Sequence, residues 1–179
     1  FPIGENMDLV YLLNPMPMIE PRFLNTRIKL EDDIPLAVYE YVKWFSYNNK
    51  NVIIMVPDEE KLSKVYYTYK NNAKVVKYEK GDDFKNIKNI VKNEPAFIVT
   101  NSMGDYINSI EDVNILILFG DDASYTYKQI VYLCGCIYVK SDILPEVLLV
   151  SRETSVEMDK SRNIIREFNK KLWEKNLLR

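Results

Sequence analysis

Histidine is absent from this 179-residue chain, and cysteine is limited to two residues. The chain therefore lacks the commonest general base and the commonest metal ligand, which excludes serine–histidine and cysteine–histidine nucleophile systems. Cys134 and Cys136 lie two residues apart in a predicted helix, so they point to opposed faces and cannot bridge each other there. We expect no metal site, and a reducing cytoplasm fits the two thiols best.

Glycine is also scarce, and none of the five glycines is followed by lysine. A phosphate-binding loop needs backbone N–H groups and a lysine to hold the phosphates, so we predict no nucleotide cradle and no cofactor held by this chain alone. Two apolar runs that end in acids, VIIMVPDEE and LILFGDD, lack the accompanying loop. We interpret their acids as helix caps and turns, with a metal or acid–base role for Glu59–Glu60 and Asp121–Asp122 as the alternative.

No apolar run approaches the roughly 20 residues of a membrane-spanning helix, and we expect neither membrane insertion nor a signal peptide. Hydrophobic residues make up 47% of the chain and charged residues 28%, which is typical of one globular domain. The net charge of −2 gives no global attraction for nucleic acid, although a local basic face remains open.

Apolar runs alternate with helix patterns from residue 32 onward. Strands are predicted at 51–56, 74–78, 95–100, 113–119 and 146–150, and helices are predicted to begin near Asp32, Asp58, Asp82 and Tyr125 and at a capping box over 154–157. Strands that alternate with helices predict a mainly parallel sheet with helices on both faces. Residues 1–31 are interrupted by three prolines, and we expect an irregular arm or an interdomain linker there, with a possible strand at Leu9–Leu13.

The segment after Phe119 follows the carboxyl end of a predicted strand, which is where ligands of open α/β sheets bind. Tyr125, Gln129, Tyr132 and Cys136 follow at helical spacing and share one face. Tyrosines at 66, 67, 69, 125, 127 and 132 would suit base stacking, but packing half of each set in the core is the better interpretation.

From about Arg22 to Trp173, these segments in this order resemble the second RecA-like motor domain of a superfamily 2 helicase. The greatest likeness is to the late-competence DNA-uptake translocase, the ComFA-type ATPase. NVIIMVPDEEKLSKVYYTYK is similar to the fourth helicase motif, and AFIVTNSMGDYINSIEDVNILILFG is similar to the fifth motif and the strand after it. QIVYLCGCIYVKSDILPEVLLVS occupies the place of the sixth motif, Q-x-x-G-R-x-G-R. The resemblance implies a three-layer RecA-like fold over residues 32–179.

The chain departs from both of the later motifs. In the sixth motif Gln129 and Gly135 match, but the first glycine falls on Tyr132 and the two arginines fall on Leu133 and Cys136. In the family those arginines reach a triphosphate held by the first motor domain, and such an arginine supplies roughly 10³–10⁵ in rate. In the fifth motif Thr100 and Asp105 match, whereas the arginine and glycine fall on Tyr106 and Ile107.

Two main hypotheses follow from the resemblance. The first is the C-terminal motor domain of a helicase-like, ATP-dependent DNA translocase, cytoplasmic and of the competence type, with ATP and magnesium held by a first RecA-like domain of the same protein. The second is a catalytically inactive pseudo-helicase that acts as a protein-interaction scaffold. A free-standing small-molecule enzyme would need a glycine fingerprint that the chain lacks.

The first hypothesis assigns two sets of residues. The resemblance places contacts to the DNA backbone at Thr100, Asn101 and Ser102, and the nearby cations Lys61, Lys64 and Lys128 would add to the affinity. It places Asp105, Gln129 and Gly135 on the face toward the nucleotide and the first domain. The C-terminal cations Arg162, Arg166, Lys170 and Lys171 are better interpreted as a solvated helix face.

Overall fold

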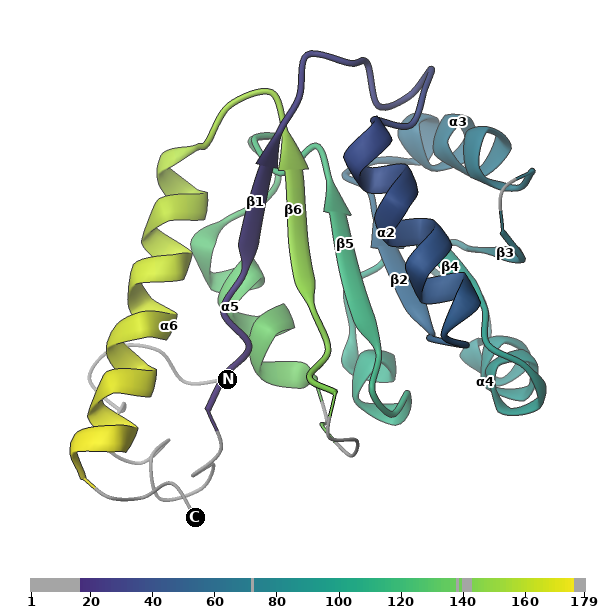
Figure 1. Cartoon of the computed structure of the whole chain (residues 1–179). Coiled ribbons are helices and arrows are strands. Elements are labelled where there is room, and N and C mark those ends of the chain that lie inside the picture. Colours follow the sequence, from purple (N-terminus) through teal and green to yellow (C-terminus); the bar gives the residue numbers. More distant parts are fainter. Residues whose placement is uncertain (1–16, 72, 138, 140–142, 176–179) are drawn as a thin grey trace.

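The computed structural model describes residues 17–71, 73–137, 139 and 143–175. Within this part of the chain, one sheet has the strand order β1-β6-β5-β2-β4-β3, and all neighbouring strands run parallel (Figure 1). The strands are β1 (Arg22–Asn25), β2 (Val52–Met55), β3 (Val75–Tyr78), β4 (Phe97–Thr100), β5 (Asn114–Leu118) and β6 (Val147–Ser151).

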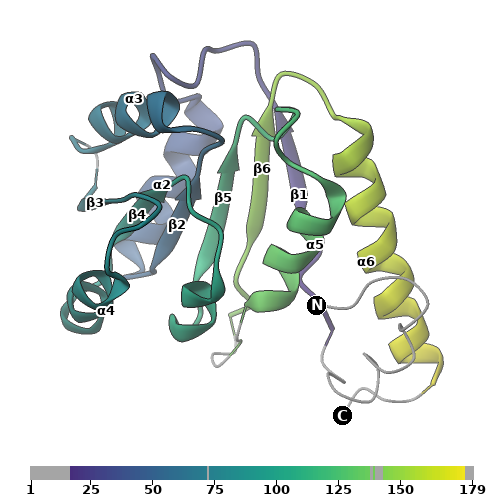
Figure 2. The same cartoon turned by 180° about the vertical axis from the view of Figure 1, so that it is seen from behind.

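Helices cover both faces of this sheet (Figures 1 and 2). Helices α2 (Leu36–Tyr47) and α3 (Glu59–Tyr69) pack on one face. The other face packs against α4 (Phe84–Asn93), the short 3₁₀ helix η1 (Asp105–Ser109), α5 (Tyr127–Cys136) and α6 (Val156–Glu174). No helix in the described part of the chain combines the length and apolar content needed to cross a membrane.

The central strands β2 and β5 are apolar except at Asn114, because each face of the sheet has its own core. In β2, Ile53 contributes to the core beneath α5 and α6, and Ile54 to the core beneath α2 and α3. The predicted α/β class, with three layers and a mainly parallel sheet between helices, is therefore confirmed. The strands predicted at 51–56, 95–100 and 113–119 form β2, β4 and β5 with shorter bounds.

Two predicted helix caps are wrong by one residue. Asp83, not Asp82, caps α4 by accepting from the Lys85 N–H, while Asp82 accepts from the Glu79 N–H in the preceding turn. Ser155 caps α6 by accepting from the Met158 N–H, so Thr154 and Glu157 form no capping box. Adjacent polar residues compete for each cap, and the path of the incoming chain decides between them.

Residues 17–31 contain more regular structure than the sequence indicates. Residues 22–25, expected to be irregular, form the edge strand β1 parallel to β6, and this correction adds a strand of the sheet before residue 32. Just before β1, Met18 exchanges two hydrogen bonds with the side chain of Asn169 in α6, at 2.8 and 2.9 Å. The strand suggested at Leu9–Leu13 lies outside the described residues.

Candidate nucleic-acid and interdomain site

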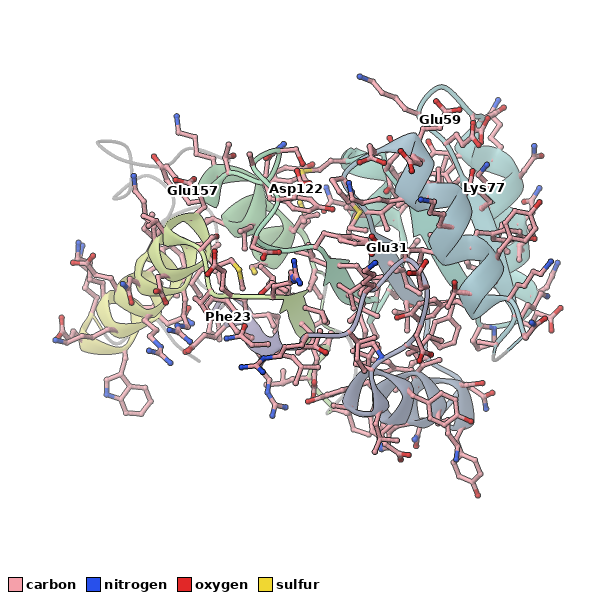
Figure 3. The ribbon with its side chains drawn as sticks, turned by 90° about the horizontal axis from the view of Figure 1, so that it is seen from above. Phe23, Glu31, Glu59, Lys77, Asp122 and Glu157 are labelled. Carbon is pink, nitrogen blue, oxygen red and sulfur yellow. The ribbon has the colours of Figure 1, made fainter. Side chains whose placement is uncertain are left out.

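The carboxyl ends of the parallel strands meet along one edge of the sheet, which we call the carboxyl edge. There the chain leaves β2 toward β3 on one side and leaves β5 toward β6 on the other. Such a reversal is where α/β sheets form their ligand crevice. Figure 3 looks onto this edge and shows Asp122 near its middle, with Glu157 on one side and Glu31 on the other.

The crevice at this reversal is filled by charged groups that satisfy one another. The Lys61 ammonium lies 2.6 Å from the Asp58 carboxylate and 3.8 Å from that of Asp122, and 5.4 Å from the ring centre of Phe119. The hydrogen bond with Asp58 raises the pKa of Lys61 above its usual value despite partial burial. Asp58 also caps α3, as predicted, by accepting from the Lys61 N–H. Beside this cluster remains a cavity of 190 Å³, lined by Lys29, Glu31, Asp121 and Arg152 among others.

The end of β4 and the loop after it hold the three predicted backbone-contact residues, and only two of them reach the surface. Thr100 is fully buried (0% exposed), and its hydroxyl accepts from the Ser102 N–H at 2.9 Å. Direct contact of Thr100 with nucleic acid is therefore ruled out in this conformation, and its role is to position the loop. Asn101 and Ser102 are half-buried, and Asn101 Oδ1 has no hydrogen-bond partner among the described residues.

Tyr106 holds the same loop from below, and the sequence alone did not suggest it. Its hydroxyl donates to the Ser102 carbonyl, and its ring lies 5.1 Å from that of Tyr78 and 4.8 Å from that of Phe84. Burial raises the pKa of Tyr106 well above its usual value, so the hydroxyl stays protonated and can donate. Tyr106 therefore occupies the position of the fifth-motif arginine. Its ring forms a cluster with those of Tyr78 and Phe84, which we call the aromatic clamp. Asp105 begins η1 directly before it.

The predicted cations differ in whether a carboxylate pairs with them. Lys61 belongs to the crevice cluster, and Lys64 pairs with Glu60 at 2.7 Å. Lys128, in the first turn of α5, is exposed and forms no ion pair within 4.0 Å among the described residues. Of the three, only Lys128 offers an uncompensated charge near the carboxyl edge.

The predicted nucleotide-facing helix α5 is anchored by its own polar groups. Gln129 completes a capping box with Thr126: its Oε1 accepts from the Thr126 N–H at 2.8 Å, and its own N–H donates to Thr126 Oγ. Glu157 of α6 accepts from the Tyr127 N–H at 2.6 Å. The side-chain amide of Gln129 therefore stabilises the helix start, which its spacing after Thr126 could have indicated.

The positions of the two missing arginines lie in different surroundings. Leu133 is fully buried (0% exposed) in the core between α5 and the sheet, whereas Cys136 is half-buried near the helix end, with Tyr132 and Gly135 also half-buried. Cys134 is buried, which raises the pKa of its thiol well above the usual value and keeps it unreactive. This helix presents no cation at either arginine position.

Two of the acids left open by the sequence have structural partners, and the tyrosines lie partly in the core. Asp121 accepts from the N–H of Arg152 at 3.2 Å and ties the turn after β5 to the end of β6, and Glu60 pairs with Lys64. Among the described residues, no three potential ligands come together as a metal site. Tyr69 and Tyr125 are buried in the core and Tyr67 is exposed, so the tyrosines divide between core and surface.

No family model and no curated protein matches this chain. Among solved structures, it is similar to the C-terminal part of the Fun30 ATPase domain, with a TM-score of 0.49 and 11% identity over 78% of this chain and 52% of that one. It is also similar to the carboxyl-terminal domain of Dbp5p, with a TM-score of 0.41 and 12% identity over 99% of this chain and 90% of that one. The chain spans about half the length of the Fun30 structure. At these scores the two similarities define no activity.

Proposed function

We propose that this chain is the C-terminal RecA-like domain of a helicase-type protein, and that it binds the nucleic-acid backbone without completing an ATPase site. The observation that carries the proposal is α5: its sixth-motif glutamine is used in a capping box, and its first arginine position is a fully buried leucine. Catalysis of ATP hydrolysis needs a cation that reaches the transferred phosphate, and neither the capping glutamine nor the buried leucine supplies one. The finer role, within a competence-type DNA-uptake translocase, rests on the sequence resemblance.

Backbone binding is supported by the loop at the end of β4. Asn101 and Ser102 reach the surface beside a buried threonine and an aromatic clamp, so their positions are fixed before any ligand arrives. Short amide and hydroxyl side chains suit contacts to phosphate and sugar, which carry no base readout. Exposed Lys128 supplies a cation near the same edge.

A titration with a labelled single-stranded oligonucleotide tests this proposal. Binding should be weak and independent of sequence, and should fall steeply between about 50 and 200 mM salt because counterion release drives it. Asn101→Ala with Ser102→Ala should weaken it, whereas the matched surface pair Ser46→Ala with Asn163→Ala should not. Absence of binding by the folded domain at low salt would overturn the proposal. Steady-state ATP hydrolysis by the pure chain, abolished by substitutions within it, would contradict the non-catalytic part.

A protein-interaction scaffold is the second candidate, and the outer face of α2 favours it. Leu36, Trp44 and Tyr47 on this helix are 73%, 45% and 89% exposed. Beside them, Tyr41 and Trp44 line an open groove of 510 Å³ together with Glu40 and Glu146. Exposed aromatic anchors next to a groove are typical of protein interfaces. If the oligonucleotide does not bind, this face becomes the first place to seek a partner.

A further inference from the structure

Helix α4 carries a basic face that the sequence resemblance does not assign. Its sequence, FKNIKNIVKN, contains three lysines and no acid. Ile87 is buried against the sheet, and Lys85, Lys88 and Lys92 are exposed. We call these three lysines, with Lys50 at the adjoining end of α2, the α4 lysine face. Helix α4 lies below β4 at the amino end of the strands, away from the carboxyl edge (Figure 1).

These lysines differ from Lys61 and Lys64 at the carboxyl edge because no carboxylate pairs with them among the described residues. Among the described residues, Lys85, Lys88 and Lys92 form no ion pair within 4.0 Å. By contrast Lys61, Lys64, Lys74 and Lys170 each pair with a carboxylate. Lys88 and Lys92 also stand one helical turn apart, where like charges repel and destabilise the helix. A bound polyanion would relieve that repulsion.

A polar cleft adjoins the α4 lysine face and is lined by three of its lysines. The cleft measures 490 Å³ and runs between α4 and the turns that precede β2 and β5. Lys50, Lys88 and Lys92 line it together with Asn49, Asn51 and Ser109, and the acids Glu111 and Asp112 line it as well. Exposed Asn86, Asn89 and Asn93 continue the polar surface along α4. Lysines outnumber acids here, although the chain as a whole is acidic.

We propose that the α4 lysine face binds the phosphate backbone of a nucleic acid, as a second contact independent of the loop after β4. The inference rests on the proposed nucleic-acid function and assigns most of the electrostatic affinity to a different end of the domain. An unpaired lysine that neutralises a phosphate releases a counterion from the nucleic acid, whereas a lysine that is already paired must first give up its carboxylate. Amides interleaved with lysines suit backbone contacts without base readout.

The test compares double lysine variants in oligonucleotide titrations of the whole chain. The two glutamine variants lose the same charge, and the arginine variant keeps it. Lys88→Gln with Lys92→Gln should weaken binding by about tenfold or more near 100 mM salt, and should lower the slope of log K against log salt by about 1.4–1.8. Lys88→Arg with Lys92→Arg should retain binding. The control, Lys43→Gln with Lys170→Gln, removes two charges from α2 and α6, where Lys43 stacks on Tyr39 and Lys170 pairs with Glu174. Circular dichroism establishes that each variant is folded.

Three outcomes separate this inference from the proposed function. The inference is supported if Lys88→Gln with Lys92→Gln lowers the affinity more than the control does, and if Lys88→Arg with Lys92→Arg retains the affinity. Equal affinity of that variant and the control overturns it, and leaves binding at Asn101 and Ser102 to explain the wild-type affinity. Failure of the wild-type chain to bind at low salt overturns both.

Discussion

The carboxyl edge and the α4 lysine face both carry lysines, yet they differ in what surrounds each charge. At the carboxyl edge Lys61 lies between two aspartates and Lys64 pairs with Glu60. On α4 no acid stands one turn away from Lys88 or Lys92 within the helix. The number of lysines therefore says little about where a polyanion binds, and acids at helical spacing say more.

The same contrast extends to the uncharged groups. At the carboxyl edge, Thr100, Tyr106 and Gln129 make hydrogen bonds that hold the loop after β4 and the start of α5. The exposed lysines of α4 hold no other element in place. We therefore expect substitutions at the carboxyl edge and in α5 to lower stability. Replacing Lys88 and Lys92 should weaken binding and, by removing their repulsion, should raise stability by only roughly 0.2–0.5 kcal/mol.

The largest effect is expected when the missing arginine is restored. Leu133→Arg places a charge in a fully buried site of the hydrophobic core, and should cost at least about 4 kcal/mol in the free energy of unfolding. Cys136→Arg, at a half-buried position, should cost far less. Urea denaturation of both variants provides the measurement. A stable Leu133→Arg domain would mean that α5 can rotate or shift, and that the arginine position is not closed by packing.

This site shows what the sequence could and could not reveal. The alternation of apolar runs was sufficient to predict β2, β4 and β5, because continuous Val and Ile segments have no other stable place than between two layers of helices. The location of α5 was also predictable. Whether position 133 points to the core or to a nucleotide was not, because that depends on how the helix is rotated against the sheet. The edge strand β1 was missed because four residues between prolines and charges carry too short a pattern.

The second prediction concerns the aromatic clamp. Tyr106→Ala removes a packed ring and should cost about 3 kcal/mol. Tyr106→Phe keeps the ring and loses only the bond to the Ser102 carbonyl, which should cost about 1 kcal/mol. Thermal or urea unfolding gives both values. If the two variants were equally stable, the ring packing against Tyr78 and Phe84 would contribute nothing, and the loop after β4 would need another support.

The smallest expected effect is the pH dependence of the Lys61 cluster. Burial acts to raise the pKa of Asp58, but the hydrogen bonds from Lys61 outweigh it, and the folded-state pKa lies below the ordinary value of 3.8. The charged form therefore stabilises the fold above about pH 4, and this contribution is lost as the pH falls through the lowered pKa. Because the carboxylate is 45% exposed, the contribution should stay below about 1 kcal/mol.

Asp58→Asn isolates that contribution, since asparagine still caps a helix but does not titrate. Its stability should fall less than that of the wild type between about pH 6 and pH 3, as measured by urea denaturation at each pH. Lys88→Gln with Lys92→Gln should leave the acid dependence unchanged, because no carboxylate pairs with either lysine among the described residues. An equal change in both variants would show that the charges of α4 are coupled to acids after all, and the contrast between the two regions would disappear.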